Sequence, residues 1–231
     1  SATADWEGNT IIPRDYQRVA VNQMIYHKYG VLKAPCSSGK TIMGHLIAQK
    51  TGMRTLWLTH TVKLLEQSKA VGEIILGKGD RVGTITDGKV NLGRTITYAT
   101  VQTMAKLDPK SYKGLFNCVI VDECHRCSKS ATSYTQFSYV LNNISAEYKY
   151  GLSATPETKN GYGKSVFCNL GDIKYEIPKE ALEEEGTIMA VDICPVFTEW
   201  QYPKQAFKSD GVLDFEKAVR YLRKDNERNQ A

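Results

Sequence analysis

The stretch Ala34-Pro35-Cys36-Ser37-Ser38-Gly39-Lys40-Thr41 has the composition and spacing of a phosphate-binding loop. Such a loop surrounds a triphosphate with backbone N–H groups at the start of a helix. Lys40 is placed to reach the outer phosphates, and the Thr41 hydroxyl is placed to help hold Mg²⁺. The usual pattern begins with glycine where this chain has Ala34, so Gly39 is left to provide the close backbone approach. The alternative is a Gly/Ser loop before an ordinary helix.

The residues on either side of this loop predict a strand followed by a helix. Residues 29–34 form a short apolar run that is typical of a buried strand, and residues 41–48 have the pattern of a helix. The loop therefore lies at a strand-to-helix junction, where a helix N-terminus favours phosphate.

A second acidic motif, Asp122-Glu123-Cys124-His125, follows another apolar run at residues 116–121. Such a run is expected for a strand buried on both faces of a parallel sheet. A carboxylate at its end can hold the metal that bridges the outer phosphates, and we assign that role to Asp122. Glu123 is the candidate general base that orients or deprotonates the attacking water. A solvated acidic turn is the alternative.

Length, charge and the order of apolar segments indicate the fold class and the kinds of partner that the chain could have. The 231 residues have Lys and Arg in excess of Asp and Glu by 30 − 25 = 5, a balance that permits nucleic-acid binding without proving it. Residues 55–59, 62–76 and 81–85 alternate between strand and helix patterns, which predicts a parallel sheet with helices on both faces. We see neither an apolar run that could span a bilayer nor a secretory leader, so we expect no membrane partner and a cytoplasmic location.

The six cysteines are scattered, and Cys124 and Cys127 form half of a structural zinc pattern. A second pair at matching spacing is absent from the sequence. Reduced thiols in a cytoplasmic protein are the simpler interpretation.

With these motifs in order, the chain resembles superfamily 2 helicases and nucleic-acid translocases, specifically the first of their two RecA-like lobes. The resemblance covers most of residues 11–195 and includes the segments 14–17 (RDYQ), 34–41, 58–67 (LTHTVKLLEQ), 97–104 (TYATVQTM), the DExH box at 122–125 and 151–156 (GLSATP). It implies an α/β fold: a RecA-like P-loop domain with a mostly parallel central sheet, helices on both faces, and one lobe of a two-lobe motor.

The motif variants are similar to the branch that contains type I and III restriction motor subunits and excision-repair helicases, which makes DNA the expected partner, with RNA as the alternative. RNA-unwinding DEAD-box enzymes carry Ala-Asp where this chain has Cys124 and His125. The chain departs from relatives at Arg126, Thr158 and Asn160, so the contacts that relatives make there are not carried over.

The resemblance also implies roles for single residues. Gln17 would read the adenine edge of ATP, with Arg14 and Tyr16 packed on the ring, and Pro35 to Thr41 would bind the phosphates and Mg²⁺. His125 would join the catalytic group, and Ser153 and Thr155 would link it to the nucleic-acid surface. Candidate contacts to the nucleic-acid backbone are Thr59, His60, Thr100 and Gln102. A threonine before a helix is equally suited to be its cap, and Gln17 alone is a weak signal.

Three segments are expected along the chain: a tail at 1–10, the ATP-binding lobe at 11–203 and a helical connector at 204–231 that leads toward a second RecA-like lobe. Residues 225–229 resemble the entry to that lobe, and residues 215–223 have helical spacing. Because relatives draw arginine fingers from the second lobe, we expect these residues alone to bind ATP weakly and to hydrolyse it slowly. The alternatives are a kinase-like P-loop enzyme and a nucleotide-gated binding module with little turnover.

Overall fold

The computed structural model describes residues 5–6, 9–86, 89–128, 131–157, 164–184, 186–187, 201–208 and 210–224. The chain divides into two compact units, Ser1–Met189 and Ala190–Ala231. The boundary that the sequence places at residue 203 falls inside the second unit, where Pro203 precedes a 3₁₀ turn at Lys204–Ala206. Positions Thr158, Asn160 and 225–229, which were singled out above, lie outside the described residues.

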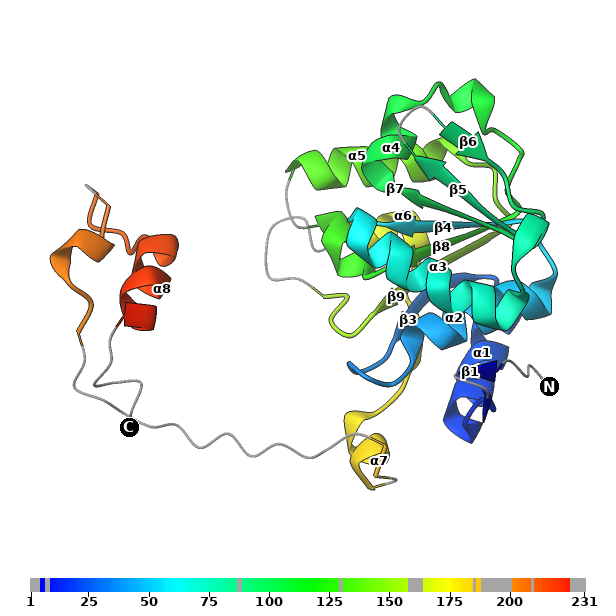
Figure 1. Ribbon diagram of the computed structural model, residues 1–231, viewed down its shortest axis with the longest axis horizontal. Coiled ribbons are helices and arrows are strands. Elements are labelled where there is room, and N and C mark those ends of the chain that lie inside the picture. The colour runs from blue at the N-terminus through cyan, green and yellow to red at the C-terminus, as the bar shows by residue number, and fades with distance from the viewer. Residues whose placement is uncertain are drawn as a thin grey trace. The chain divides into compact units, whose positions relative to one another are not determined.

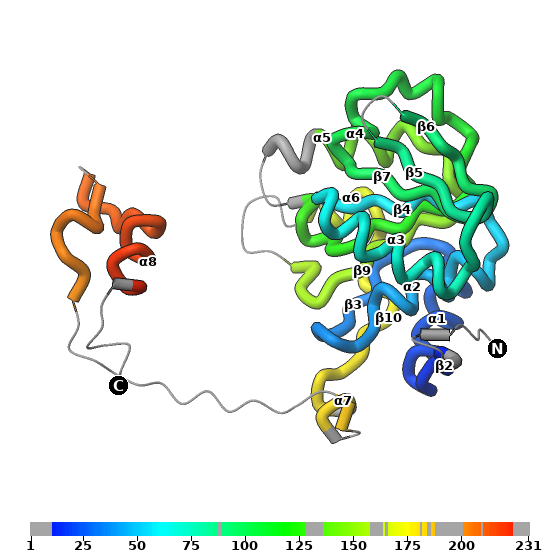
Figure 2. Tube along the Cα trace, in the orientation of Figure 1, coloured from blue at the N-terminus to red at the C-terminus, as the bar shows by residue number. Residues whose placement is uncertain are grey.

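The first unit is built on an eight-stranded sheet with the spatial order β10-β3-β9-β8-β4-β7-β5-β6. Its neighbouring strands are parallel except for β5 and β6. The strands are β3 (Tyr29–Lys33), β4 (Thr55–Thr59), β5 (Val82–Thr86), β6 (Lys89–Asn91), β7 (Ile96–Thr100), β8 (Cys118–Asp122), β9 (Tyr148–Ser153) and β10 (Ile173–Glu176). Strands β3 and β10 are neighbours although they come from opposite ends of this unit (Figure 2). A separate short ladder pairs β1 (Asp5–Trp6) with β2 (Asn9–Thr10).

Helices connect these strands and lie on both sides of the sheet (Figure 1). They are α1 (Asp15–His27), α2 (Lys40–Thr51), α3 (Val62–Leu76), α4 (Val101–Lys106), α5 (Ala131–Asn143), α6 (Lys164–Leu170) and α7 (Lys179–Glu184), with 3₁₀ turns at Gly79–Arg81, Pro109–Ser111 and Cys124–Ser128. The second unit contains α8 (Phe215–Lys224). Among the described helices, none is long and apolar enough to cross a membrane.

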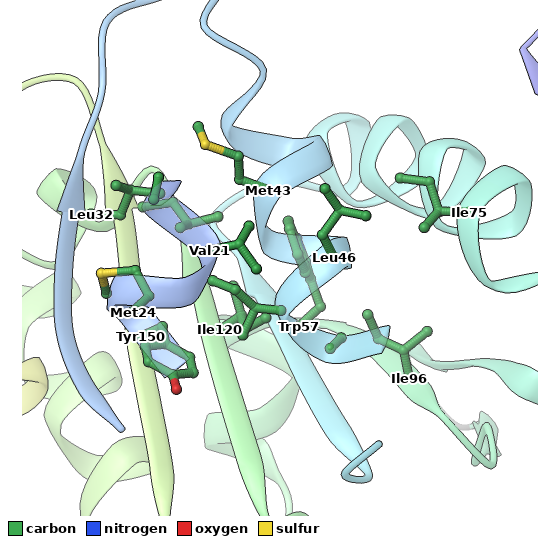
Figure 3. Close-up of a cluster of buried hydrophobic side chains, with 14 of the residues drawn as sticks. Val21, Met24, Leu32, Met43, Leu46, Trp57, Ile75, Ile96, Ile120 and Tyr150 are labelled. Carbon is green, nitrogen blue, oxygen red and sulfur yellow. The ribbon is translucent and has the colours of Figure 1, made fainter. Parts of the chain in front are cut away.

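The core consists of two apolar layers, one on each face of the sheet. One layer joins α1, α2 and α3 to residues such as Trp57 and Ile120, and Figure 3 shows part of it. The other joins α4, α5 and α6 to residues such as Leu58 and Val121. Successive residues of one strand enter opposite layers, as the two-residue period of a strand requires. The predicted fold, a mostly parallel sheet with helices on both faces, is confirmed.

Because neighbouring strands run parallel, their carboxyl ends lie at the same edge of the sheet. In this sheet, paired register aligns Lys33 of β3 with Ser153 of β9 and Thr59 of β4 with Thr100 of β7. Asp122 ends β8 between them, paired with Leu152. The phosphate loop, the DExH box and the 151–156 segment therefore leave the sheet at the same edge.

Candidate active site

The phosphate loop turns sharply before α2 begins at Lys40. Ser37 and Gly39 have left-handed φ angles of 65° and 80°, and alternation of this kind points successive N–H groups into one concavity. A Cβ atom on residue 39 would lie 2.5 Å from the Gln17 amide nitrogen, so a side chain there would be strained by the positive φ and would displace Gln17. The Ser38 hydroxyl donates to the Pro35 carbonyl over 2.7 Å and closes the loop on itself.

Lys40 is 8% exposed, and its ammonium group donates to the carbonyl oxygens of Ala34 at 3.2 Å and Pro35 at 3.1 Å. These bonds compensate for the loss of water around a buried charge. They also hold the cation on the inner side of the loop, where it can exchange a carbonyl for a phosphate oxygen.

Asp122 ends β8 and is 5% exposed. Its Oδ1 accepts from the Glu123 backbone N–H at 3.0 Å, and its Oδ2 accepts from the Ser68 hydroxyl at 3.2 Å. Burial, with a smaller effect from the neighbouring Glu123 charge, raises the pKa of the Asp122 carboxyl to about 6. A nearby cation would favour its ionised form.

Glu123 occupies a left-handed backbone conformation, with φ of 50°, which is unfavourable for a residue that has a Cβ. This conformation directs its carboxylate to His125, whose Nδ1 lies 3.2 Å from Glu123 Oε2. The bond to His125 lowers the pKa of Glu123 and keeps its carboxylate ionised, as a general base requires.

His125 Nδ1 also lies 3.0 Å from the Ser153 hydroxyl oxygen, which accepts from the Thr155 N–H at 3.1 Å. The predicted contact between His125 and Ser153 is thus present. Thr155 joins the network through its backbone. The end of β9 is in this way connected to the candidate general base.

The phosphate loop and the two DExH-box carboxylates meet at a cavity of about 320 Å³. Its lining combines the loop, the DExH box and one face of α3: Cys36, Ser37, Gly39, Lys40, Thr41, Leu64, Gln67, Ser68, Val71, Asp122 and Glu123. Sequence reasoning missed the four α3 residues. Their spacing of three, four and seven residues marks one helix face and was the available signal.

The donor set of this cavity fits Mg²⁺. Thr41 and Asp122 would supply the oxygen ligands, and no group of three or more His, Cys, Asp or Glu side chains suited to a metal ion is found within the described part of the chain. Mg²⁺ is typically held by one or two carboxylates together with phosphate oxygens and water, whereas structural zinc requires four N or S ligands.

The segment expected to read adenine is hydrogen-bonded to the phosphate loop. The Gln17 amide donates to the Ser38 carbonyl at 3.0 Å, and its oxygen accepts from the Arg14 N–H at 3.0 Å. The Tyr16 hydroxyl donates to the same Ser38 carbonyl at 3.0 Å. Each end of the Gln17 side chain thus has a backbone partner, and the reading of adenine by Gln17 stays a prediction. Arg14 is exposed.

Two of the four predicted nucleic-acid contacts have a local structural role. Thr59 is fully buried and its hydroxyl donates to the Thr61 carbonyl at 3.1 Å. Thr100 is 6% exposed and caps α4, accepting from the Thr103 N–H at 3.2 Å. The interpretation as a helix cap therefore holds for Thr100, whereas Thr59 bonds within the turn before α3. His60, after β4, and Gln102, in the first turn of α4, are only partly buried, and their side chains bond to each other at 3.3 Å.

Comparison with known proteins identifies relatives of this chain. The family described as "Type III restriction enzyme, res subunit" matches residues 10–158. The DNA 3'-5' helicase XPB of Mycobacterium tuberculosis (strain ATCC 25618 / H37Rv) is 26% identical over 79% of this chain and 34% of its own length. The probable helicase D10 of Escherichia phage T5 is 36% identical over 53% of this chain and 26% of its own length.

Among solved structures, the UvsW helicase from bacteriophage T4 shares the fold with a TM-score of 0.62 at 20% identity, covering 76% of this chain and 64% of that chain. The chain spans about a third of the length of the curated relatives it matches. The family match covers most of the described first unit, including the phosphate loop and the DExH box. The chain therefore belongs to the family of type III restriction enzyme res subunits and has the fold of the first RecA-like lobe of superfamily 2 helicases.

Proposed function

We propose that the chain is the ATP-binding lobe of a DNA helicase or translocase that couples ATP hydrolysis to movement on nucleic acid. The observation that carries this proposal is the single cavity that collects Lys40, Thr41, Asp122 and Glu123. Together they provide the cation, the hydroxyl and the two carboxylates that phosphoryl transfer to water needs.

The roles follow from the geometry of the cavity. The loop N–H groups and Lys40 bind the phosphates, and the Thr41 hydroxyl and the Asp122 carboxylate hold Mg²⁺. When bound, Mg²⁺ neutralises charge on the phosphate oxygens. Glu123 orients the attacking water and accepts its proton, and the bond to His125 maintains the ionised carboxylate that this step needs.

DNA is the proposed polynucleotide because several relatives are named as DNA helicases or translocases, including the XPB proteins and the uvsW helicase of phage T4. In this chain, His60 and Gln102 stand at the carboxyl edge of β4 and β7, next to the strands that form the ATP cavity. Contacts from such loops reach the sugar-phosphate backbone, so binding should be independent of base sequence and weakened by salt.

A second RecA-like lobe is the proposed partner in catalysis. The chain matches 34% of the length of one curated relative and 26% of another, which leaves room for that lobe in the relatives. In other phosphoryl-transfer enzymes, an arginine finger from a partner raises kcat by about 10³- to 10⁵-fold. The isolated chain is accordingly expected to bind ATP and turn it over slowly.

RNA is the second candidate polynucleotide, since the putative ATP-dependent RNA helicase L396 of Acanthamoeba polyphaga mimivirus is 31% identical over 62% of this chain. A comparison of ATPase stimulation by DNA and by RNA of equal length distinguishes the two. Stronger stimulation by RNA would favour this second candidate.

The function is tested by steady-state ATP hydrolysis in a protein that contains this lobe and its partner lobe, with and without DNA. We expect DNA-stimulated turnover that falls by about 10²-fold or more in Glu123→Gln, because the amide cannot accept the proton. Glu66→Gln, an exposed carboxylate on α3, is the matched control and should retain parent activity. Parent-level turnover by Glu123→Gln would remove the assigned base and with it the proposed mechanism.

A further inference from the structure

Ser68 is a buried serine on α3 whose hydroxyl points at the candidate metal ligand. It is 2% exposed, and its Oγ donates to Asp122 Oδ2 over 3.2 Å. The same side chain lines the cavity that contains Lys40 and Thr41. The two bonded residues are 54 positions apart, so this contact belongs to the tertiary structure and not to a local turn.

The bond completes the fixation of the Asp122 carboxylate. Oδ1 is already held by the Glu123 N–H, and Oδ2 is held by Ser68. Each carboxylate oxygen can accept more than one partner, so both keep capacity for a cation. Loss of the Ser68 hydroxyl would leave one buried oxygen without this donor and release rotation about the carboxyl bond.

Helix α3 does not depend on Ser68 for its attachment to the core. Leu65, Ile75 and Leu76 of α3 are all buried in the apolar layer on its side of the sheet. Removal of one hydroxyl should therefore disturb the carboxylate more than the position of the helix.

We propose that Ser68 is a positioning residue that fixes the Asp122 carboxylate in the orientation needed to bind Mg²⁺ with the nucleotide. This inference rests on the proposed function, because it assigns a role within the same ATP site. Hydrogen-bonded partners of metal ligands typically contribute 10- to 100-fold to metal affinity.

The test is equilibrium binding of a fluorescent ATP analogue to the 231-residue chain, titrated with Mg²⁺ and repeated in EDTA. We expect Ser68→Ala to raise the Mg²⁺ concentration for half-maximal binding about tenfold and to leave the affinity in EDTA unchanged. Ser68→Thr, which retains the hydroxyl, should recover most of the Mg²⁺ response. Thr55→Ala is the matched control, since Thr55 is also fully buried but bonds to Met53 at the opposite end of β4.

A thermal unfolding curve is recorded for each variant. A purely structural role for Ser68 predicts that Ser68→Ala and Thr55→Ala both lower the melting temperature with equal Mg²⁺ dependence, and that result would overturn the inference. Failure of the unaltered chain to bind the analogue at any Mg²⁺ concentration would contradict the proposed function itself. Normal binding by the unaltered chain with an unshifted Mg²⁺ response in Ser68→Ala would contradict only the role of Ser68.

Discussion

At the scale of single residues, Gly39 shows how backbone geometry controls the site. Its positive φ and its closeness to Gln17 both exclude a side chain. Gly52 at the end of α2 also has a positive φ, of 64°, but a Cβ there would meet nothing within 4 Å. Both glycines have a positive φ, but only at Gly39 would an added side chain also contact a neighbouring residue. Comparing the two positions therefore separates backbone strain from steric contact.

We expect Gly39→Ala to lose most ATP affinity, because the added methyl group would displace Gln17 and the loop N–H groups. Gly52→Ala carries only the penalty for a left-handed alanine, about 1 kcal/mol of unfolding free energy, and should bind ATP normally. Calorimetric ATP titrations and urea unfolding of both variants measure the difference. Equal ATP affinity in the two variants would show that the contact at Gln17 is unimportant.

His45 is a second informative residue, because it is a fully buried imidazole on α2. Its Nδ1 lies 2.7 Å from the Thr41 carbonyl, which can only accept, so Nδ1 carries the proton and Nε2 accepts from the Tyr98 hydroxyl at 2.6 Å. The ring stacks on Trp57 with centroids 4.3 Å apart. Burial lowers the pKa of His45 to about 4, which keeps it neutral.

This environment predicts a pH-dependent stability. In the unfolded chain His45 takes up a proton below its ordinary pKa of about 6.5, whereas the folded chain resists protonation until about pH 4. The stabilisation is therefore complete above pH 6.5 and is lost progressively as the pH falls toward 4, by roughly 3 kcal/mol. Because the raised pKa of Asp122 acts in the opposite direction over the same range, the His45 contribution is measured as the difference between urea unfolding of the unaltered chain and of His45→Gln from pH 7 to pH 4.5.

The comparison for this prediction is His45→Gln, which removes the fully buried imidazole. His45→Gln should lower stability at pH 7 but lose less stability than the unaltered chain as the pH falls, because the buried imidazole is gone and the raised pKa of Asp122 favours the folded chain at lower pH. An equal loss of stability in His45→Gln and in the unaltered chain would assign the effect to other groups.

At the scale of elements, the predictions from sequence were best where an apolar pattern and the backbone pairing coincide. The predicted strand 55–59 and the pattern at 62–76 match β4 and α3. The strand predicted at 116–121 forms at Cys118–Asp122, because Phe116 is apolar but packs in the core before pairing with β4 begins at Cys118. Helix α2 continues three residues beyond the predicted 41–48 pattern, to Thr51 before Gly52.

The short helix α4 gives an element-scale prediction about nucleic-acid contacts. Thr100→Ala removes the cap of α4 and should lower the unfolding free energy by about 1 kcal/mol with little effect on DNA affinity. Gln102→Ala removes a partly exposed amide at the sheet edge and should weaken DNA binding several-fold with little effect on stability. Fluorescence anisotropy with a single-stranded oligonucleotide, together with urea unfolding, separates the two effects. A loss of DNA affinity in Thr100→Ala equal to that in Gln102→Ala would restore the threonine as a contact.

At the scale of the whole molecule, the sequence was sufficient for the parts of the site that are local in the chain. The phosphate loop and the DExH box each form a continuous motif, so their spacing predicts both fold class and chemistry. The bond from Ser68 to Asp122 and the bridge from His45 to Tyr98 depend on which helix covers which strand. No local pattern specifies that arrangement, and for the same reason the bond from Gln17 to the Ser38 carbonyl was not predicted.

The account depends most on the claim that this cavity binds ATP with Mg²⁺ through Lys40. Isothermal titration of the 231-residue chain with ATP and Mg²⁺ tests it directly, with Lys40→Ala compared against Lys50→Ala, an exposed lysine at the other end of α2. We predict one ATP site in the unaltered chain, an affinity at least about tenfold lower in Lys40→Ala because the charge on the phosphates is unpaired, and normal affinity in Lys50→Ala. Equal ATP affinity in Lys40→Ala and the unaltered chain would contradict the account.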